Sequence, residues 1–396
     1  MIVKKEKKMS ETLKLYYEDP YLQEFEAVVT GCSPAGGNYA VTLDRTAFYP
    51  EGGGQPGDTG TLGNAAVLDT IEKDDSILHI TDSPLTPGST VIGCLDFDRR
   101  FDFMQQHSGE HIVSGLVCAA FGCHNVGFHM GTDVVTIDFD CVITEDELRQ
   151  IEAEANRRIW SDRKTEILYP APEELESIEY RSKKELTGQV RLVCFPGTDI
   201  CACCGIHVER TGEIGMVKIL SVVNFRDGVR VEMISGQRVY SYLNAVSAQN
   251  SQISVLLSAK ISETAQAVKR LHEENYQLRS EISALQEASF ALEAERQNGA
   301  GNVLLFKEAL SSDNVRRLTD AVMNSCGGRC AVFSDNGDGS FKYAIGEKGG
   351  DLRSFTKEMN HALNGRGGGK PFFVQGSVKA EEQAIRDFFS VRQTTD

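Results

Sequence analysis

Two histidines mark the stretch Gln105–Gln106–His107–Ser108–Gly109–Glu110–His111. The apolar residues that follow, from Ile112 to Phe121, recur at the spacing of an α-helix. Residues i and i+4 of a helix lie on one face, about 6 Å apart along the axis, so both imidazoles can reach one ion. The stretch therefore predicts a helix that begins after Arg100, ends near Gly122 and presents two metal ligands.

A second cluster lies far along the chain, at Cys201–Ala202–Cys203–Cys204–Gly205–Ile206–His207. Cys203 and His207 have the same spacing as the histidine pair, but the glycine between them favours a loop. A histidine pair alone is more often incidental than metal-binding, whereas this cluster supplies two further ligands. Three imidazoles and one thiol form a tetrahedral donor set of the kind that zinc prefers. The sequence therefore predicts a Zn2+ site.

The composition is that of an ordinary globular protein, with 41% hydrophobic and 25% charged residues. A chain of 396 residues exceeds what one core normally serves, so several domains are expected. No apolar run is long enough to span a bilayer, and the N-terminus lacks the apolar core of a signal peptide. We therefore expect a cytoplasmic protein with no membrane partner, whose 11 cysteines are reduced thiols or metal ligands.

The formal charge of −16 argues against a protein that coats nucleic acid through general phosphate neutralisation. The charge is unevenly placed, because residues 301–396 carry 13 Lys and Arg against 12 Asp and Glu. A polyanion would therefore bind most easily to the C-terminal part of the chain.

The order of these patterns predicts an α+β protein in four segments. Residues 1–95 carry short alternating stretches, beginning at Leu13–Tyr17, and are expected to form a small β-barrel. Residues 96–235 combine the histidine helix with further strands in an α+β zinc-containing domain. A long coiled-coil helical segment (236–298) and a small C-terminal α/β domain (299–396) follow.

The segment Phe48–Gly60 is rich in glycine, and Gly52, Gly53 and Gly54 precede Gln55 in it. Glycine permits positive φ angles and lets a backbone approach a ligand closely. The segment is not a P-loop, because no Gly-Lys-Ser/Thr follows and no helix begins there. Composition alone favours an elaborate β-turn.

The segment Gln237–Gln297 contains neither proline nor glycine, and its later part has a heptad pattern. The positions of the predicted seam are Val268, Leu271, Asn275, Leu278, Ile282, Leu285, Ser289 and Leu292. A polar residue at a seam position, here Asn275, is one way of fixing the register of a coiled coil. Self-association as a homodimer and an intramolecular helical hairpin both fit this pattern.

Beyond a hinge at 298–302, the segment Gly365–Pro371 places Arg366 and Lys370 around three glycines. Such a loop could offer backbone N–H groups and positive charge to phosphate. A flexible turn fits the same composition equally well.

Taken together, several motifs resemble the alanyl-tRNA editing proteins, which are freestanding relatives of the editing domain of alanyl-tRNA synthetase. The resemblance rests on Leu15–Tyr21, the Gly52–Gln55 motif, the His107/His111 pair and the Cys203–His207 loop. The C-terminal domain resembles the C-terminal module of the same synthetase. The likeness covers essentially the whole chain, and it identifies the zinc-containing domain as an editing domain.

The resemblance implies that His107, His111, Cys203 and His207 bind the metal. It implies that Gln55, His107 and His111 are the catalytic residues of the editing site and that Gly53, Gly54 and Gln55 contact the substrate. This sequence departs from the family loop at Cys204, where glycine is usual, and at Ile206, where threonine is usual. Neither departure removes a ligand.

The activity implied by the resemblance is hydrolysis of the ester that joins serine, or glycine, to alanine tRNA. A pocket built for alanine excludes neither amino acid strongly, so a second hydrolytic site is needed. No adenylation domain precedes the editing region, so editing in trans is expected. Arg366 and Lys370 would then bind the tRNA.

Two alternatives use the same residues differently. His107–Ser108–Gly109–Glu110–His111 spells the H-x-x-E-H motif of a zinc metallopeptidase, with Glu110 as general base. A closed four-ligand site also suits a non-catalytic RNA-binding protein with structural zinc.

Overall fold

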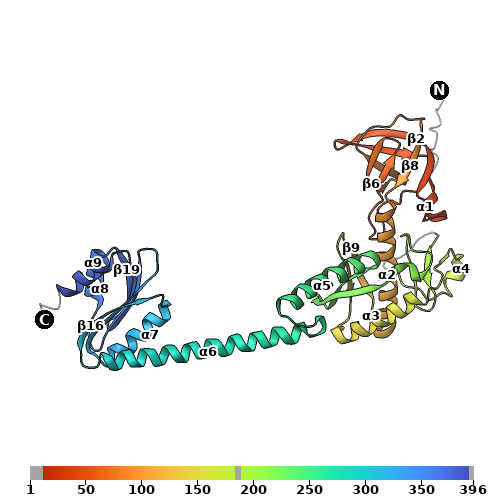
Figure 1. The fold of residues 1–396 in the computed structure, drawn as a ribbon. Helices are drawn as coiled ribbons and strands as arrows, with labels where there is room; N and C mark the ends of the chain where they lie inside the picture. Colours follow the sequence, from red (N-terminus) through yellow and green to blue (C-terminus); the bar gives the residue numbers. More distant parts are fainter. Residues whose placement is uncertain (1–11, 183–188, 392–396) are drawn as a thin grey trace. The chain divides into compact units, whose positions relative to one another are not determined.

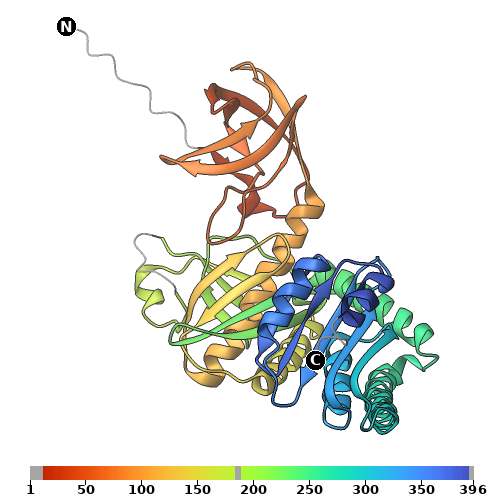
Figure 2. The same cartoon turned by 90° about the vertical axis from the view of Figure 1, so that its left-hand side faces the viewer.

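The computed structural model describes residues 12–182 and 189–391, and the chain divides into two compact units, Met1–Asn250 and Ser251–Asp396 (Figures 1 and 2). Each unit combines helices with sheets, so the expected α+β class is confirmed. The boundary at residue 250 falls inside the long helical segment. The finer division into four segments stays a prediction.

Six antiparallel strands of the first unit pair in a closed ring, where a small β-barrel was expected. In ring order they are β2 (Glu24–Ala35), β3 (Asn38–Leu43), β7 (Ser76–Thr81), β6 (Ala65–Lys73), β5 (Gly60–Leu62) and β8 (Thr90–Leu95), which pairs back on β2. Alternate residues are buried along β2 and β7, as period-two strands with one covered face require. Phe25, Val41 and Leu62 share the resulting hydrophobic cluster.

The expectation of a strand over Leu13–Tyr17 is wrong at its C-terminal end. Only β1 (Leu13–Lys14) pairs, in parallel with β4 (Arg45–Thr46), and the chain then turns into the short helix α1 (Leu15–Glu18). This turn buries Tyr16 and leaves Tyr17 half-buried. The two rings pack edge to face, 4.6 Å between centroids.

Helix α2 (Phe97–Phe121) is the element that carries the histidine pair (Figure 1). It begins slightly earlier than predicted, because the Asp96 side chain caps it by accepting from the N–H of Arg99. It ends as predicted at Gly122, which adopts a left-handed φ of 63°. The wholly buried Arg100 donates to the Asp58 carboxylate and to the carbonyl of Ala47, which ties the helix to the glycine-rich segment.

The remainder of the first unit surrounds α2. One sheet has the order β14-β15-β10-β9 and another the order β11-β12-β13. Their strands are β14 (Val217–Phe225), β15 (Gly228–Ser235), β10 (Val135–Phe139), β9 (Asn125–Met130), β11 (Glu166–Leu168), β12 (Leu192–Phe195) and β13 (Asp199–Ala202). The helices are α3 (Glu145–Trp160), α4 (Pro172–Leu175) and the 3-10 turn η1 (Thr211–Ile214). Helix α2 contacts α3, η1, β9, β13 and β15, so every residue from Phe103 to Gly115 is buried, a stretch of more than three turns.

The long helical segment is interrupted. Helix α5 (Gly236–Leu256) ends before a 3-10 turn, η2 (Ile261–Glu263), and α6 (Thr264–Arg296) begins after it. Ser258 adopts a positive φ of 49° at the break. Neither glycine nor proline marks this position, so the break has no local signal in the sequence.

The second unit contains a five-stranded sheet in the order β16-β17-β18-β20-β19. The strands are β16 (Gly301–Glu308), β17 (Gly327–Asp335), β18 (Phe341–Glu347), β20 (Phe373–Val378) and β19 (Gly365–Lys370). Helix α7 (Ser312–Met323) packs on β17, β18 and α6, while α8 (Arg353–Ala362) contacts β19 and β20. The last helix is α9 (Glu382–Ser390).

The glycine loop expected at 365–371 is instead the edge strand β19. It pairs with β20 along its whole length. A Cβ at Gly367 would lie 2.4 Å from the Gln375 carbonyl oxygen, and one at Gly369 would lie 2.4 Å from that of Phe373. The glycines therefore allow close approach of two backbones rather than the flexibility of a loop.

Candidate metal centre

The histidine pair and the cysteine loop meet in the first unit as the sequence predicts. The atoms of His107, His111, Cys203 and His207 that could bind a metal all lie within 4.8 Å of one another. Cys203 Sγ is 3.5 Å from His107 Nε2. The three imidazoles are buried and the thiol is half-buried. Two ligands come from α2 and two from the loop that follows β13.

Each of the three imidazoles has a neighbour at Nδ1. Gln55 Oε1 lies 3.0 Å from His107 Nδ1, Asp199 Oδ2 lies 2.8 Å from His111 Nδ1, and Ser108 Oγ lies 3.3 Å from His207 Nδ1. These partners hold the rings so that Nε2 of each can face a common point. A ligating histidine usually has its other nitrogen fixed in this way.

The acceptor for His111 is itself held in place. The Arg181 guanidinium donates two hydrogen bonds of 2.7 Å to the Asp199 carboxylate. Burial alone would raise the pKa of Asp199, but the bonds from Arg181 and His111 bring it below its usual value. Asp199 is therefore a carboxylate that accepts from His111.

The residues present fit a metal ion. His207 Nε2 is buried without a hydrogen-bond partner among the described residues, a costly arrangement that a metal would relieve. Burial alone would raise the pKa of the Cys203 thiol, but His107 and the other histidines bring that pKa well below its usual value. Burial and the neighbouring His107 lower the pKa of His207 to about 3, which keeps that ring neutral. A thiolate with three imidazoles is a donor set suited to zinc.

Gln55 is fully buried beside the cluster. Its Oε1 accepts from the backbone N–H of Ile206 at 3.3 Å as well as facing His107. Its Nε2 has no partner within the described part of the chain. Gln55 thus connects the glycine-rich motif to both halves of the metal site, which is a positioning role that sequence reasoning did not identify.

Two glycines make room for the rings of this site. A Cβ at Gly205 would lie 2.2 Å from His107 Cε1, so the cysteine loop can pass the imidazole only with glycine there. A Cβ at Gly54, where φ is 85°, would lie 2.5 Å from the ring of Phe128. That ring stacks on His107 with centroids 5.3 Å apart. Gly53 has a positive φ and open space around its Cβ direction.

Glu110 does not occupy the position of a general base. It is buried, and its Oε1 accepts from Ser114 Oγ at 2.7 Å and from Asn125 Nδ2 at 2.6 Å. These bonds join α2 to β9. The carboxylate therefore has a structural role, which disfavours the metallopeptidase alternative.

Arg366 and Lys370 lie in the second unit, on the edge strand β19, and both are exposed. Arg366 lines an open groove of about 700 Å³ together with Arg316 and Lys342. Asp313 also lines the groove and pairs with Arg316, but the cationic side chains outnumber this carboxylate, which suits a phosphate backbone. Binding of tRNA by Arg366 and Lys370 stays a prediction.

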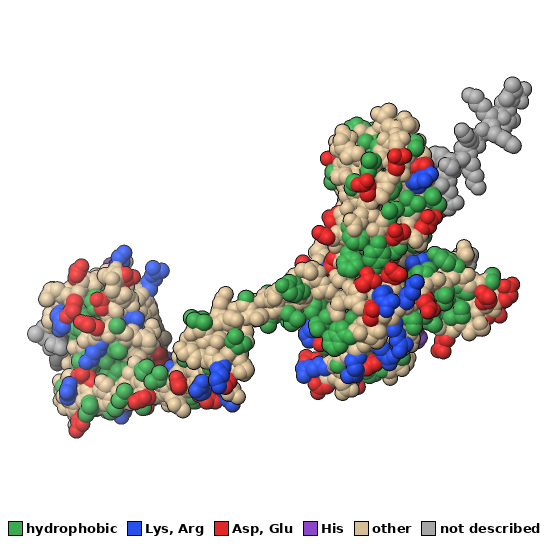
Figure 3. All heavy atoms as spheres, turned by 45° about the vertical axis from the view of Figure 1, so that its right-hand side comes forward, with side chains coloured by type: hydrophobic (Ala, Val, Ile, Leu, Met, Phe, Trp, Pro, Cys, Tyr) green, Lys and Arg blue, Asp and Glu red, His purple; other side chains and the backbone are tan. Residues whose placement is uncertain are grey.

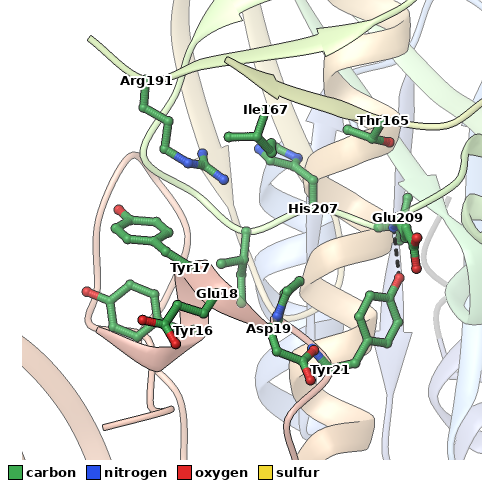
Figure 4. A pocket seen from close by; sticks show the side chains of 13 residues that line it. Tyr16, Tyr17, Glu18, Asp19, Tyr21, Thr165, Ile167, Arg191, His207 and Glu209 are labelled. Atoms are coloured by element: carbon green, nitrogen blue, oxygen red, sulfur yellow. Dashed lines mark hydrogen bonds between the residues drawn. The ribbon is translucent and has the colours of Figure 1, made fainter. Parts of the chain in front are cut away.

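A cavity of about 320 Å³ adjoins the metal cluster, because His207 lines it (Figure 4). Figure 4 shows Thr165, Ile167 and Arg191 along one wall and Tyr16, Tyr17 and Tyr21 along the opposite wall. The tyrosines hold the cysteine loop, since Tyr17 donates to the Cys204 carbonyl at 2.9 Å and Tyr21 accepts from the N–H of Glu209 at 2.8 Å.

Sequence reasoning missed Asp199, Ser108, Arg181 and this cavity. Ser108 lies inside the histidine motif and Asp199 lies close to the cysteine loop, but neither has a spacing that distinguishes it from its neighbours. Thr165 lies just before β11, far from both motifs, and Arg191 lies just before β12, 12 residues before Cys203. Only the fold brings them to the metal ligands.

Comparison with known proteins places three families along the chain. Residues 5–99 match the class II (A) tRNA synthetases, residues 190–240 match the second additional domain of threonyl and alanyl tRNA synthetases, and residues 299–391 match the DHHA1 domain. In the part of the chain that is described, no helix has the length and apolar character required to cross a membrane.

Two relatives are similar over nearly their whole length. The alanyl-tRNA editing protein Aarsd1 of Mus musculus is 27% identical over 96% of this chain and 99% of the mouse protein. The alanyl-tRNA editing protein AlaX-L of Pyrococcus horikoshii is 28% identical over 94% of this chain and 96% of its own length. Similarity therefore extends across both units.

The chain is also similar to alanine–tRNA ligases, of which it spans less than half. That of Methanoregula boonei is 33% identical over 92% of this chain but only 41% of the ligase. Among solved structures, the C-Ala domain of Aquifex aeolicus alanyl-tRNA synthetase aligns with 23% of the chain at 20% identity, with a TM-score of 0.21 that is too low to establish a shared fold.

Proposed function

The chain is a relative of the alanyl-tRNA editing proteins over nearly its whole length, and we propose that it hydrolyses mischarged alanine tRNA in trans. The bond cleaved is the ester between the tRNA and serine, or glycine. The observation that carries this proposal is the buried His/Cys cluster with a cavity beside it. It combines a site for a Lewis-acidic ion with room for an organic substrate.

Four protein ligands, His107, His111, Cys203 and His207, would leave Zn2+ no free coordination position. If one of them were exchanged, the ion would polarise the ester carbonyl or lower the pKa of a water molecule, and otherwise it would orient the substrate. The chain's own residues prepare the site for this chemistry. Gln55, Asp199 and Ser108 orient the imidazoles, and the surrounding apolar core limits the access of bulk water. The unpartnered Nε2 of Gln55 offers a hydrogen bond to a substrate oxygen.

The alternative of a non-catalytic RNA-binding protein is favoured by one observation, the presence of four candidate protein ligands, which together would fill the coordination positions of zinc. Structural zinc sites are closed in this way. The cavity at His207 favours catalysis, because a purely structural site has no need of an adjoining space of this size.

The experiment that tests the proposed function is deacylation of purified alanine tRNA charged with serine, glycine or alanine. We expect serine to be released much faster than alanine, and a chelator to abolish the release until zinc is added back. Equal rates for serine and alanine, or no release from any of the three, would refute the proposal. Tight tRNA binding without hydrolysis would instead support the non-catalytic alternative.

We further propose that the second unit binds the tRNA body and joins two copies of the chain. Support for tRNA binding comes from the cationic groove at Arg366 and from the near-neutral charge of residues 301–396. Support for a homodimer comes from the seam on α6, whose large apolar side chains are exposed, among them Leu278 at 57% and Leu285 at 65%.

A further inference from the structure

We infer that Arg158 and Arg163, whose guanidinium groups both lie beside Gly197, form a binding site for a phosphate group of a polynucleotide. The inference rests on the proposed function for the source of that polynucleotide, the acceptor end of the mischarged tRNA. All three residues belong to the first unit. The space-filling view shows Lys and Arg side chains gathered on the lower part of that unit, the part that contains α3 (Figure 3).

The two guanidinium groups meet at an exposed turn between β12 and β13. Gly197 has a φ of 73°, which favours glycine, and a Cβ in its place would lie 3.5 Å from Arg163 Nη1 and 3.8 Å from Arg158 Nη1. Apart from the chain neighbours of Gly197, no other atom of the described residues lies within 4 Å of that position. The space beside the turn is therefore bounded by two cationic groups, and glycine keeps it open.

The positive charge at this turn is only partly balanced. Arg158 Nε donates to the Glu154 carboxylate at 2.7 Å, but the same carboxylate also accepts from Arg157 at 2.8 Å. Arg163 is exposed and forms no ion pair with any residue of the described ranges. Two like charges beside one point repel each other, and an anion bound between them would offset that repulsion.

Two further cations lie next to Arg163 on the surface. Lys164 and Arg210 face each other across an antiparallel β-bridge. Arg210 pairs with Asp162 at 2.8 Å, whereas Lys164 is 3.9 Å from Glu209, which is longer than a hydrogen bond. Exposed ion pairs of this kind contribute little to stability, so these cations can also contact another anion. A row of cations suits a polyanion with a charge at each phosphate better than one small anion.

The turn is close to the metal cluster. Gly197 lies two residues after Phe195, whose ring centroid is 5.6 Å from that of His111, and two residues before Asp199, which accepts from the same histidine. Two residues span at most about 7 Å. A phosphate at Gly197 would therefore lie within a few nucleotides of an ester held at the cluster, since a stacked strand advances about 3.4 Å for each nucleotide.

A local cationic site also answers the charge of the whole chain. With a formal charge of −16, the chain repels a polyanion over much of its surface. Cations beside the reaction site would attract the strand to the place where its ester is cleaved. This contact would be separate from the one proposed for the tRNA body in the second unit.

The sharpest test fills the space with a fixed carboxylate. Gly197→Asp would place an anion between the two guanidinium groups and leave both arginines intact, and Asp tolerates a positive φ better than most residues. Gly197→Asn is the matched control, because it has the same shape without the charge. The full-length zinc-loaded protein is titrated, by fluorescence anisotropy, with an RNA hairpin that copies the acceptor stem and 3′ end of alanine tRNA and carries no amino acid. We expect Gly197→Asp to raise the Kd about tenfold over that of Gly197→Asn.

A second pair of variants changes the arginines themselves. Arg158→Gln with Arg163→Gln should reduce the slope of log K against log salt by up to about two. Arg158→Lys with Arg163→Lys should keep most of the slope, because lysine binds phosphate as a point charge, and a purely structural role of the arginines would not be rescued in this way. Arg45→Gln with Arg149→Gln removes two exposed arginines elsewhere in the first unit and should leave the slope unchanged.

Three outcomes would overturn the inference. The first is equal affinity of the Asp and Asn variants at Gly197 for the hairpin. The second is an identical salt slope for the arginine-to-glutamine pair and its control. The third is complete displacement of the hairpin by micromolar inorganic phosphate at constant ionic strength, which would make the turn a site for a free small anion.

The failure of this inference is distinguishable from that of the proposed function, because binding of the hairpin requires no hydrolysis. If the protein deacylates seryl-tRNA while the arginine variants bind the hairpin like the parent, the phosphate site is refuted and the proposed function stands. If binding depends on Arg158 and Arg163 but no aminoacyl-tRNA is hydrolysed, the phosphate site stands and the proposed activity fails.

Discussion

Proteins usually bury apolar side chains and expose polar ones, and the metal cluster and the seam of α6 depart from this rule in opposite ways. At the cluster, polar groups are buried, including three imidazoles, Gln55 and Glu110. Along α6, large apolar side chains are exposed, from Val268 at 49% to Leu292 at 58%. Buried polar groups need partners, and contiguous exposed apolar residues mark interaction sites. Each region therefore supports one of the proposals above, an ion at the first and another helix against the second.

The first prediction removes one proposed ligand from the metal cluster. Cys203→Ala removes the thiolate ligand and should lower the bound zinc from one per chain to near zero, with at least a hundredfold loss of deacylation. Cys201→Ala is the matched control, because Cys201 lies near His111 and Asp199 but outside the four-ligand set. Metal content by plasma emission spectroscopy and single-turnover deacylation measure both variants. Equal losses in the two would show that the ligand set is misassigned.

The clustering of the four proposed ligands could be predicted from sequence because metal ligands come as spaced residues of characteristic type. His107 and His111 lie on a periodic helix, and Cys203 and His207 supply the complement. The residues that orient them could not be predicted. Asp199 accepts from His111 across 88 positions of sequence, and Gln55 reaches His107 across 52. Hydrogen bonds of this range depend on the tertiary fold, which local patterns do not encode.

The fold shows the same division between local and long-range information. The fold class and the ends of several helices follow from the periodicity of apolar residues and from helix-capping residues, such as Gly122 at the end of α2. Strand β19 was mistaken for a loop because a run of glycines has low β-propensity, whereas its pairing with β20 requires glycine at Gly367 and Gly369. The break after α5 was missed because Ser258 carries the positive φ that glycine normally supplies.

The second prediction weakens the cluster without removing a ligand. Asp199→Asn keeps the size of the side chain but removes the charge that orients His111 and pairs with Arg181. Zinc affinity should fall about 10- to 100-fold by chelator competition, and activity should recover at high zinc. Asp138→Asn is the control, because Asp138 also pairs with an arginine, Arg230, but on the surface of the sheet. An unchanged zinc affinity in Asp199→Asn would assign Asp199 a role in folding alone.

The third prediction concerns the second unit. Arg366→Ala combined with Lys370→Ala should weaken tRNA binding several-fold and reduce the slope of log K against log salt by up to about two, one for each phosphate that is no longer neutralised. Lys348→Ala with Lys357→Ala removes the same charge from exposed positions elsewhere in the unit. These substitutions are preferable to deletion of residues 301–396, which would expose Phe290 of α6. Fluorescence anisotropy at several salt concentrations distinguishes the pairs, and identical slopes would exclude Arg366 and Lys370 as phosphate ligands.

The last prediction has the smallest effect, a factor of two in mass, and it tests the seam. If α6 pairs with a second copy, Leu278 and Leu285 lie at the interface, where a buried ammonium group would be costly. Leu278→Lys with Leu285→Lys should therefore shift the mass in solution from a dimer to the single chain of 43.5 kDa. The contact of α7 with α6 leaves these two leucines exposed, so both units should remain folded.

A control variant tests whether added charge alone, rather than the loss of the two leucines, dissociates the dimer. Gln277→Lys with Ala284→Lys has the same number of changes at the same spacing, one helix position before each leucine, on an exposed face outside the seam. Light scattering should find this variant dimeric like the parent. A monomeric parent, or a dimer that survives the leucine substitutions, would show that the apolar seam on α6 joins no second copy. In that case the exposed leucines of α6 would not mark an interaction site. Exposed leucines are tolerated in water at modest cost, whereas a buried imidazole without a partner is costly.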